Sequence, residues 1–237
     1  GLGEVVGSLP LALKKAGVDV RVLCPLYRCC KDLPVRVLES EIAFRKESKV
    51  ICSKIGVLDD HKYPIPVYFL VNDHFFDRDG IYADKNGNYS DNSLRAFVLS
   101  QAAIELEKVA EWIPDIFHAH DWHAALVPYF LQQIRKTDSR FRKSRSILNI
   151  HNAGYLGRYP GYLKSWLKID DSDFHSDCFE DFGGVNLLKG GMLSADQVNT
   201  VSPGYAEELK TPLGGHGLHP FYERLEQDFS DILNGCD

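Results

Sequence analysis

From residue 93 onward, helix-like and strand-like stretches alternate along the chain. Residues 93–112 have the spacing of an amphipathic helix capped by Asp91 or Asn92. Then follow "PDIFHAH" as a strand, "WHAALVPYFLQQIR" as a helix, "SRSILNIHN" as a strand, "GGVNLLKGGMLSAD" as a helix and "QVNTVS" as a strand. A last helix, "PGYAEELK", starts with Pro203 behind Ser202 as its cap. The final "ILNGCD" is predicted to be a strand that ends in an Asn-Gly turn. This order predicts an α/β fold, with a parallel sheet and helices on both faces.

The first part of the chain has a different pattern. "GEVVGSLPLALKKAG" has helical spacing and stops at Gly17, and "VDVRVLCP" alternates as a strand does. The stretches "VRVLESEIAF", "KVICSKIGVL" and "IPVYFLVN" predict an antiparallel insertion or edge. Residues 72–92 form a long loop rich in turns and aromatic residues, which is typical of a functional loop. We interpret residues 1–237 as one α/β domain.

Composition excludes several classes of protein. The net charge is −6, and the one dense basic stretch, "RKTDSRFRKSR" at 135–145, is interrupted by polar residues, so we expect a solvated loop and no nucleic-acid partner. No apolar run approaches the length of a membrane span. The cysteines match no zinc or disulfide pattern and suit a reducing compartment; they are Cys24, Cys29, Cys30, Cys52, Cys178 and Cys236.

The opening "GLGEVVGSLP" allows two interpretations. Gly1 and Gly3 would let backbone N–H groups approach a phosphate or sugar phosphate at the start of the helix near Glu4. Alternatively, the glycines only form a tight turn. The sequence leaves both readings open.

A second polar cluster, "HAHDWHAALVP" at 118–128, follows a strand. His118 and His120 would share one face of that strand. Asp121 could cap the next helix, or it could bind sugar hydroxyls together with His123 beside the flat face of Trp122. A metal site is the minority reading, because the cluster offers one carboxylate and no matching ligands elsewhere.

A third cluster, "NIHNAGYLG", places His151 and Asn152 after the next strand. Because ligands bind beyond the carboxyl ends of parallel strands, the second and third clusters predict a polar ligand site in one crevice. Further along, Gly190 and Gly191 interrupt a helix and indicate close packing. Lys189 could stabilise an anion, although a surface lysine is the default expectation.

Five long stretches resemble one family. "GLGEVVGSLPLAL", "FHAHDWHAALVP", "HNAGYLG", "GGVNLLKGGMLSADQVNTVSPGYAEEL" and "ILNGCD" are similar, in order, to the N-terminal half of ADP-glucose-dependent glycogen and starch synthases of glycosyltransferase family 5. The resemblance implies the Rossmann-like, acceptor-side domain of a GT-B enzyme, incomplete at both ends. The first strand, a lysine, one glycine and the C-terminal domain are expected to be missing, so we expect this chain alone to be inactive.

The resemblance also implies a reaction and roles for residues. Glucose passes from ADP-glucose to the non-reducing end of an α-1,4-glucan with retention, without a metal or other cofactor, in a cleft shared with the C-terminal domain. Glu4 stands where the family usually has Asp. The residues implied are His151 and Asp121 as catalytic, Gly1, Gly3, Glu4, Asn152, Lys189 and Asn234 as donor-binding, and Tyr89, Trp122 and His123 as acceptor-binding.

Other functions remain open at this point. The chain could be a non-catalytic glucan-binding module, or part of a GT-B enzyme that uses another nucleotide sugar. A metal-dependent hydrolase built on "HAHDWH" is a distant alternative. The expected location is a bacterial cytoplasm or, alternatively, a plastid, and neither a membrane nor a nucleic acid is an expected partner.

Overall fold

A computed structural model describes residues 1–46 and 49–235. The chain forms two compact units, Gly1–Ala110 and Glu111–Asp237. The assignment of residues 1–237 to a single domain stays a prediction.

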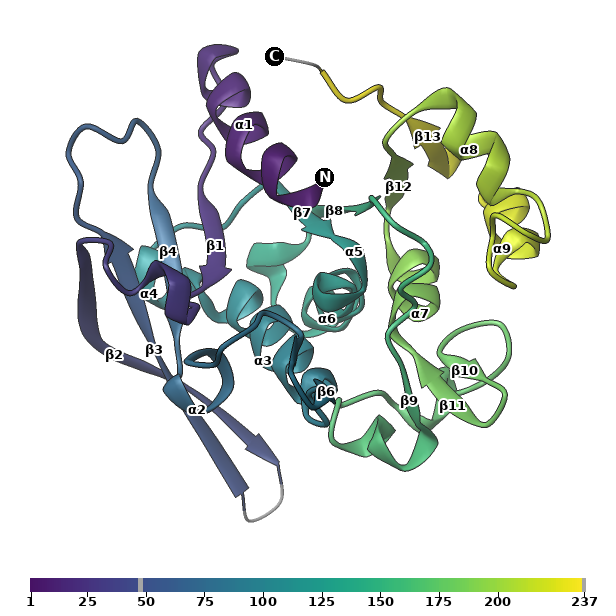
Figure 1. Ribbon diagram of the computed structural model, residues 1–237, viewed down its shortest axis with the longest axis horizontal. Coiled ribbons are helices and arrows are strands. Elements are labelled where there is room, and N and C mark those ends of the chain that lie inside the picture. Colours follow the sequence, from purple (N-terminus) through teal and green to yellow (C-terminus); the bar gives the residue numbers. More distant parts are fainter. Residues whose placement is uncertain (47–48, 236–237) are drawn as a thin grey trace. The chain divides into compact units, whose positions relative to one another are not determined.

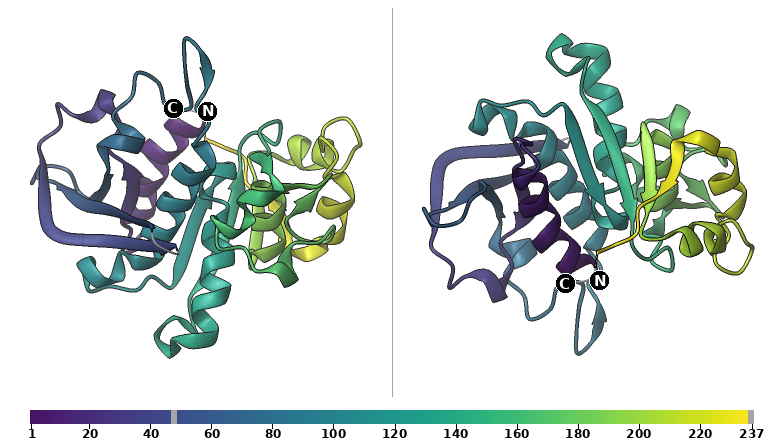
Figure 2. Two further views of the ribbon diagram at one scale, coloured as in Figure 1. Left: turned by 90° about the horizontal axis from the view of Figure 1, so that it is seen from below. Right: turned by 90° about the horizontal axis from the view of Figure 1, so that it is seen from above.

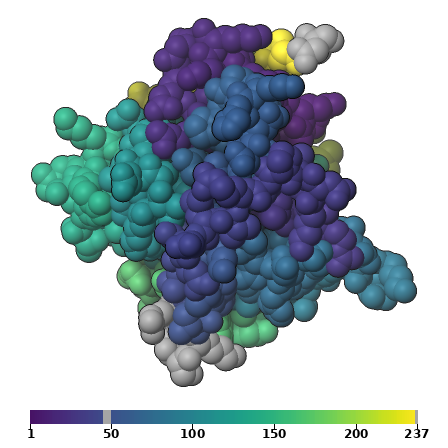
Figure 3. All heavy atoms as spheres, turned by 90° about the vertical axis from the view of Figure 1, so that its left-hand side faces the viewer, coloured from purple at the N-terminus to yellow at the C-terminus, as the bar shows by residue number. Residues whose placement is uncertain are grey.

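The first unit combines helices with a mixed sheet (Figure 1). Helix α1 (Leu2–Lys15) leads into β1 (Val22–Pro25), which pairs in parallel with β4 (Val67–Val71). β4 pairs antiparallel with β3 (Lys49–Leu58), and β3 pairs antiparallel with β2 (Val35–Lys46). Figure 3 looks onto the side of this unit that β2 and β3 form. The predicted antiparallel strands are therefore confirmed.

The turn-rich loop of this unit has short elements of its own. They are α2 (Asp73–Phe76), β5 (Ala83–Asp84) and β6 (Gly87–Asn88). Outside this loop the unit also contains η1 (Arg28–Cys30), before β2, and α3 (Asn92–Glu105) and α4 (Glu107–Ala110), after β6. The predicted helix over 93–112 is thus divided in two. Asp91 occupies the cap position but makes no capping hydrogen bond, because its carboxylate accepts hydrogen bonds from both Nη atoms of Arg78.

A parallel sheet organises the second unit. Its order is β13-β12-β8-β7, and every neighbouring pair is parallel. The strands are β7 (Ile116–His120), β8 (Arg145–Ile150), β12 (Gln197–Thr200) and β13 (Phe229–Asp231). The predicted parallel sheet is confirmed. The prediction of a strand at "ILNGCD" is wrong in its position, since β13 ends at Asp231.

Helices connect these strands as the alternation predicts. They are α5 (Asp121–Ala124), α6 (Leu126–Thr137), α7 (Leu187–Ser194), α8 (Pro203–Leu209) and α9 (His219–Arg224), with short 3-10 helices η2 (Ser139–Phe141), η3 (Gly161–Ser165), η4 (Asp171–Asp173) and η5 (Glu226–Asp228). α6 packs against β7 and β8 (Figure 2). Ser202 caps α8 as predicted, since its Oγ accepts a hydrogen bond from the N–H of Tyr205 at 3.1 Å.

A small antiparallel sheet lies beside the parallel one and was not predicted. Its order is β10-β11-β9, formed by β10 (Glu180–Asp181), β11 (Gly184–Asn186) and β9 (Arg158–Pro160). These strands are too short to show a recognisable alternation of apolar and polar residues in the sequence.

The glycine pair in α7 lets this helix pack closely. A Cβ on Gly190 would overlap the ring of Phe179, and a Cβ on Gly191 would overlap the carbonyl group of Ala125. The sequence-based expectation of a packing reason for both glycines is therefore confirmed.

The structure also bears on the cysteines and on the search for membrane-spanning helices. Cys24, Cys29, Cys30, Cys52 and Cys178 are free thiols, and Cys236 lies outside the described residues. Within residues 1–46 and 49–235, none of the helices is long and apolar enough to span a bilayer.

Candidate functional site

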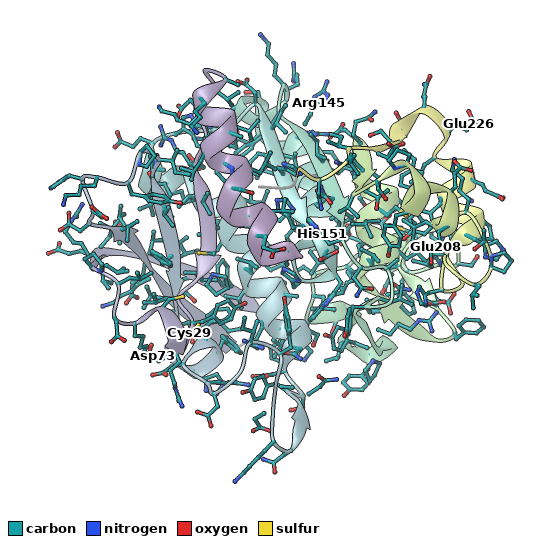
Figure 4. The ribbon with its side chains drawn as sticks, turned by 45° about the horizontal axis from the view of Figure 1, so that its top comes forward. Cys29, Asp73, Arg145, His151, Glu208 and Glu226 are labelled. Atoms are coloured by element: carbon teal, nitrogen blue, oxygen red, sulfur yellow. The ribbon has the colours of Figure 1, made fainter. Side chains whose placement is uncertain are left out.

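The carboxyl ends of β7 and β8 bring two of the predicted clusters together. β7 ends at His120 and is followed by Asp121, while β8 is followed by His151 and Asn152. The Asp121 carboxylate accepts hydrogen bonds from the backbone N–H groups of His151 at 2.8 Å and Asn152 at 3.3 Å. The predicted convergence of these strand ends is confirmed by these bonds and by the parallel pairing of β7 with β8. Figure 4 labels His151 among the side chains.

Asp121 is a structural support for the loop after β8. Its side chain is buried, its φ is +55°, and burial raises its pKa to about 6 against the opposing effect of the two backbone N–H groups. An Asp tolerates this left-handed backbone better than most residues. The alternative that Asp121 caps the following helix is wrong, since its carboxylate is directed to the neighbouring strand end.

Three imidazoles lie beside this carboxylate. The rings of His118 and His120 stack with centroids 4.4 Å apart, which confirms that they share one face of the strand. The Nδ1 of His120 lies 3.0 Å from the Nε2 of His151. This pair of rings links β7 to the loop after β8.

Burial keeps these imidazoles neutral. Burial, together with a smaller effect of the neighbouring imidazoles, lowers the pKa of His120 to about 3 and that of His151 to about 4. One ring of the pair therefore donates a hydrogen bond to the other at neutral pH. Within the described chain, the buried Nδ1 of His151 has no hydrogen-bond partner. An unpaired buried polar atom is costly, so this atom suits a ligand hydroxyl group.

Trp122 and His123 extend the site along α5. Their rings meet edge to face with centroids 5.6 Å apart, and the ring centroids of Trp122 and Tyr159 lie 6.2 Å apart. Gly157 has a φ of +62°, and a Cβ there would lie 3.0 Å from Cε3 of Trp122. The loop after β8 therefore packs directly on the indole. The acceptor-binding role of Trp122 and His123 stays a prediction.

Asn152 shapes its own loop. Its Oδ1 accepts a hydrogen bond from the N–H of Gly154 at 2.9 Å, as in an Asx turn. The next residue, Ala153, donates its N–H to the hydroxyl oxygen of Tyr205 at 2.9 Å. The donor-binding role of Asn152 stays a prediction.

Lys189 is not the surface lysine that the sequence favours. It is 3% exposed, its Nζ donates a hydrogen bond to the backbone oxygen of Glu180 at 2.7 Å, and the ammonium lies 4.6 Å from the ring centroid of Phe221. Burial lowers its pKa. Its contact with a donor substrate stays a prediction.

Asn234 lies just beyond the strands of the parallel sheet. It is exposed, and its backbone N–H donates a hydrogen bond to the oxygen of Val201 at 3.1 Å, immediately after β12. This contact holds the segment at the same edge of the sheet as His151. Its donor-binding role stays a prediction.

The opening glycines belong to the first unit. No atom of the described residues lies within 4 Å of a Cβ built on Gly1 or Gly3, and Gly3 is helical with no left-handed φ. A tight turn therefore does not explain the glycine at position 3. Glu4 is exposed in the first turn of α1. A helix start with glycine at positions 1 and 3 is suited to a backbone approach by an anion. The donor-binding roles of Gly1, Gly3 and Glu4 stay predictions.

Tyr89 also belongs to the first unit. Its hydroxyl oxygen accepts a hydrogen bond from the N–H of Gly80 at 3.2 Å. The guanidinium groups of Arg78 and Arg95 lie 4.8 Å and 5.2 Å from its ring centroid. The aromatic loop position is therefore held firmly, and its contact with a glucan stays a prediction.

The metal reading finds no geometric support. Among residues 1–46 and 49–235, no three His, Cys, Asp or Glu side chains are placed to hold a metal ion.

The sequence analysis missed two contributors to the site. They are His120 as the partner of His151, and Tyr205 as the partner of the backbone N–H of Ala153. The alternating histidines of "HAH" gave a signal for the first, while nothing in the sequence indicated the second.

Comparison with known proteins agrees with this geometry. A family model described as "Starch synthase catalytic domain" matches residues 1–224. Glycogen synthase of Geotalea daltonii is 36% identical over the whole chain, which covers 49% of that protein. Glycogen synthase 1 of Geobacter sulfurreducens is 38% identical over the whole chain, which covers 48% of that protein. The chain thus spans about half the length of the curated relatives it matches.

A solved structure has the same fold. The catalytic domain of starch synthase IV from Arabidopsis thaliana, bound to ADP and acarbose, superimposes with a TM-score of 0.87 at 30% identity. The match covers all of this chain and 48% of that one. The fold is therefore the N-terminal half of a GT-B starch synthase, as the resemblance implied.

Proposed function

Since this chain belongs to the starch synthase catalytic domain family, we propose that its protein transfers glucose from ADP-glucose to the non-reducing end of an α-1,4-glucan, with retention. The observation that carries the proposal is the neutral, partly satisfied His151 at the carboxyl edge of a parallel sheet. Its backbone is fixed by Asp121 and its Nε2 by His120. Such a preorganised group acts on a substrate without reorganising.

The charge of His151 fits the chemistry of glucosyl transfer. The bond between the anomeric carbon and the diphosphate breaks, the diphosphate leaves with the bonding electrons, and positive charge develops on the sugar. A cationic imidazole would oppose that charge, whereas burial holds His151 in its neutral form. The Nδ1 of a neutral imidazole can instead hydrogen-bond a glucose hydroxyl.

The substrates follow from the family and the neighbouring structure. The Arabidopsis relative was solved with ADP and with acarbose, which supports an ADP-linked donor and a glucan acceptor. We assign Gly1, Gly3 and Glu4 to the donor and Trp122 with His123 to the acceptor. The proposed reaction uses no cofactor, and its proposed location is a bacterial cytoplasm, in line with the bacterial relatives.

The test is a transfer assay on the natural protein that carries this sequence. Radiolabelled ADP-glucose and glycogen are incubated with the protein, and the labelled polymer is digested to establish the α-1,4 linkage. The His151→Ala variant is expected to lose at least about 100-fold in kcat. Absence of transfer from ADP-glucose by the natural protein, or full transfer by the variant, contradicts the proposal.

A further inference from the structure

The hairpin between β10 and β11 carries an unusual turn. Asp181 pairs with Gly184, so Phe182 and Gly183 form a two-residue turn, with φ values of +51° and +79°. Positive φ at both positions is the type I′ geometry, which favours Asn-Gly. A phenylalanine is strained there.

Packing does not explain this phenylalanine. Phe182 is 94% exposed, so its ring contributes almost no buried area to folding. A residue that strains the backbone and buries nothing is expected to serve a function outside the fold.

The ring is held by a cation. The Arg158 guanidinium lies 5.7 Å from the Phe182 ring centroid, and its Nε donates a hydrogen bond to the carboxylate of Asp181 at 2.5 Å. Arg158 is therefore anchored at one end of the turn while it contacts the aromatic ring. Contacts between a guanidinium and an aromatic face contribute about 0.5–1 kcal/mol at exposed sites.

A second exposed aromatic residue follows the ladder on the neighbouring segment. β9 pairs with β11 through Tyr159 opposite Val185 and Pro160 opposite Gly184, and the ladder ends there. Tyr162 comes next to Gly161 in η3 (Gly161–Ser165), as Phe182 comes next to Gly183 in the turn. A Cβ on Gly161 would overlap the carbonyl oxygen of Gly183, so the chains remain in contact there. Tyr162 is 74% exposed. We call Arg158, Tyr162 and Phe182 the aromatic tip.

The aromatic tip is continuous with the candidate acceptor residues. β9 carries Tyr159, whose ring centroid lies 6.2 Å from that of Trp122. Tyr162 follows Tyr159 by three residues and lies in η3, directly after β9. Figure 1 shows the segment after β8 passing α7 and reaching β9 beside β10 and β11.

We propose that the aromatic tip is a docking site for an α-glucan chain, separate from the residues assigned to transfer. Exposed aromatic faces with polar edges suit the C–H faces and hydroxyl groups of sugars. Two aromatic side chains offer at most roughly 500 Å², whereas a stable protein partner needs about 800 Å². The identity of the glucan rests on the proposed function; the docking itself does not require transfer.

The test uses a substitution that improves the turn while removing the ring. Phe182→Asn creates the preferred Asn-Gly turn, so its unfolding temperature should equal or exceed that of the parent. Affinity for glycogen, measured by affinity electrophoresis, and for maltoheptaose, measured by calorimetry, should fall at least about fivefold. Phe182→Trp should retain binding, and Ile116→Thr, at an exposed apolar residue on β7, is the matched control.

The outcomes separate this proposal from the proposed transfer. Parent-like glycogen binding by Phe182→Asn overturns the docking site, even if the protein transfers glucose normally. Weakened binding by Phe182→Asn supports the docking site, even if no transfer is found. A change in sedimentation coefficient without a change in glucan binding identifies a protein contact and also overturns the proposal.

Discussion

The Nδ1 of His120 lies 3.0 Å from the Nε2 of His151, so two partly buried, neutral imidazoles share one hydrogen bond. The bond couples the tautomers of the two rings, because whichever ring nitrogen donates determines the state of the other. His120 is therefore a positioning residue: it acts through His151 and orients the Nδ1 that we assign to the substrate.

Replacing His120 should separate positioning from packing. We expect His120→Phe to lower kcat about 10- to 100-fold with little change in KM, since the His151 ring loses its orientation. His120→Asn, whose amide can replace the lost Nδ1, should recover part of that rate. Steady-state kinetics and the ¹⁵N chemical shifts of His151 check both variants. Equal rates for the two variants, or an unchanged tautomer in the phenylalanine variant, would show that His120 has a packing role only.

Asp121 holds the loop after β8 through two backbone hydrogen bonds. Asp121→Ala leaves two N–H groups without their acceptor and puts alanine at a φ of +55°, so we expect a loss of about 2–3 kcal/mol in the free energy of unfolding. Asp121→Asn keeps the Oδ1 acceptor and tolerates that φ, so it should lose less than about 1 kcal/mol. Urea titrations of both variants measure the difference; equal losses would mean that the hydrogen bonds do not stabilise the loop.

The alternation after residue 93 predicted β7, β8 and β12 of the parallel sheet because these strands are long enough to show their period. For the same reason, the strand ends could be predicted to carry the polar residues His120, Asp121 and His151. The β9–β11 sheet could not, since its strands are two or three residues long. Nor could the burial of Lys189, which depends on Glu180 and Phe221 closing over its ammonium.

Motif similarity assigned roles that the residues alone left open. The sequence offered Asp121 as a helix cap or a ligand, and the structure adds a third role, in which it supports the neighbouring strand end. That role needs the register of β7 against β8, which no local pattern contains. The strand predicted at "ILNGCD" was misplaced for a similar reason. β13 is defined by its pairing with β12, and that pairing ends at Asp231.

Gly191 permits the close approach of α7 to the backbone around Ala125. We expect Gly191→Ala to destabilise the protein by about 1–3 kcal/mol, because the added methyl group meets a carbonyl group that cannot move without shifting the backbone. Gly204→Ala is the matched control: Gly204 lies in α8, and a Cβ added there would have no atom of the described chain within 4 Å. The control should be neutral or stabilising by up to about 1 kcal/mol. Thermal unfolding of the two variants compares packing with helix propensity directly, and equal losses would contradict the packing explanation.

The imidazole cluster should make stability depend on pH. Burial lowers the pKa of His120 to about 3 and of His151 to about 4 from an ordinary 6.5. Between about pH 4 and pH 6.5 the unfolded chain therefore binds more protons at these residues, and their contribution to the free energy of unfolding falls as the pH falls. Asp121 acts in the opposite direction, since its pKa of about 6 lies above the ordinary 3.8. Two histidines outweigh one carboxyl group, so we expect a net loss of stability on acidification.

Two substitutions test the sign of each contribution. His120→Asn removes one histidine, so its free energy of unfolding should decline less steeply than that of the parent between about pH 6.5 and pH 4. Asp121→Asn removes the opposing carboxyl group, so its decline should be steeper. Urea unfolding at closely spaced pH values measures the three slopes, and other titrating groups cancel in the comparison because they are common to all three proteins. A steeper decline for His120→Asn would mean that the imidazole is stabilised in its charged form, and it would remove the argument that a neutral His151 faces the developing positive charge.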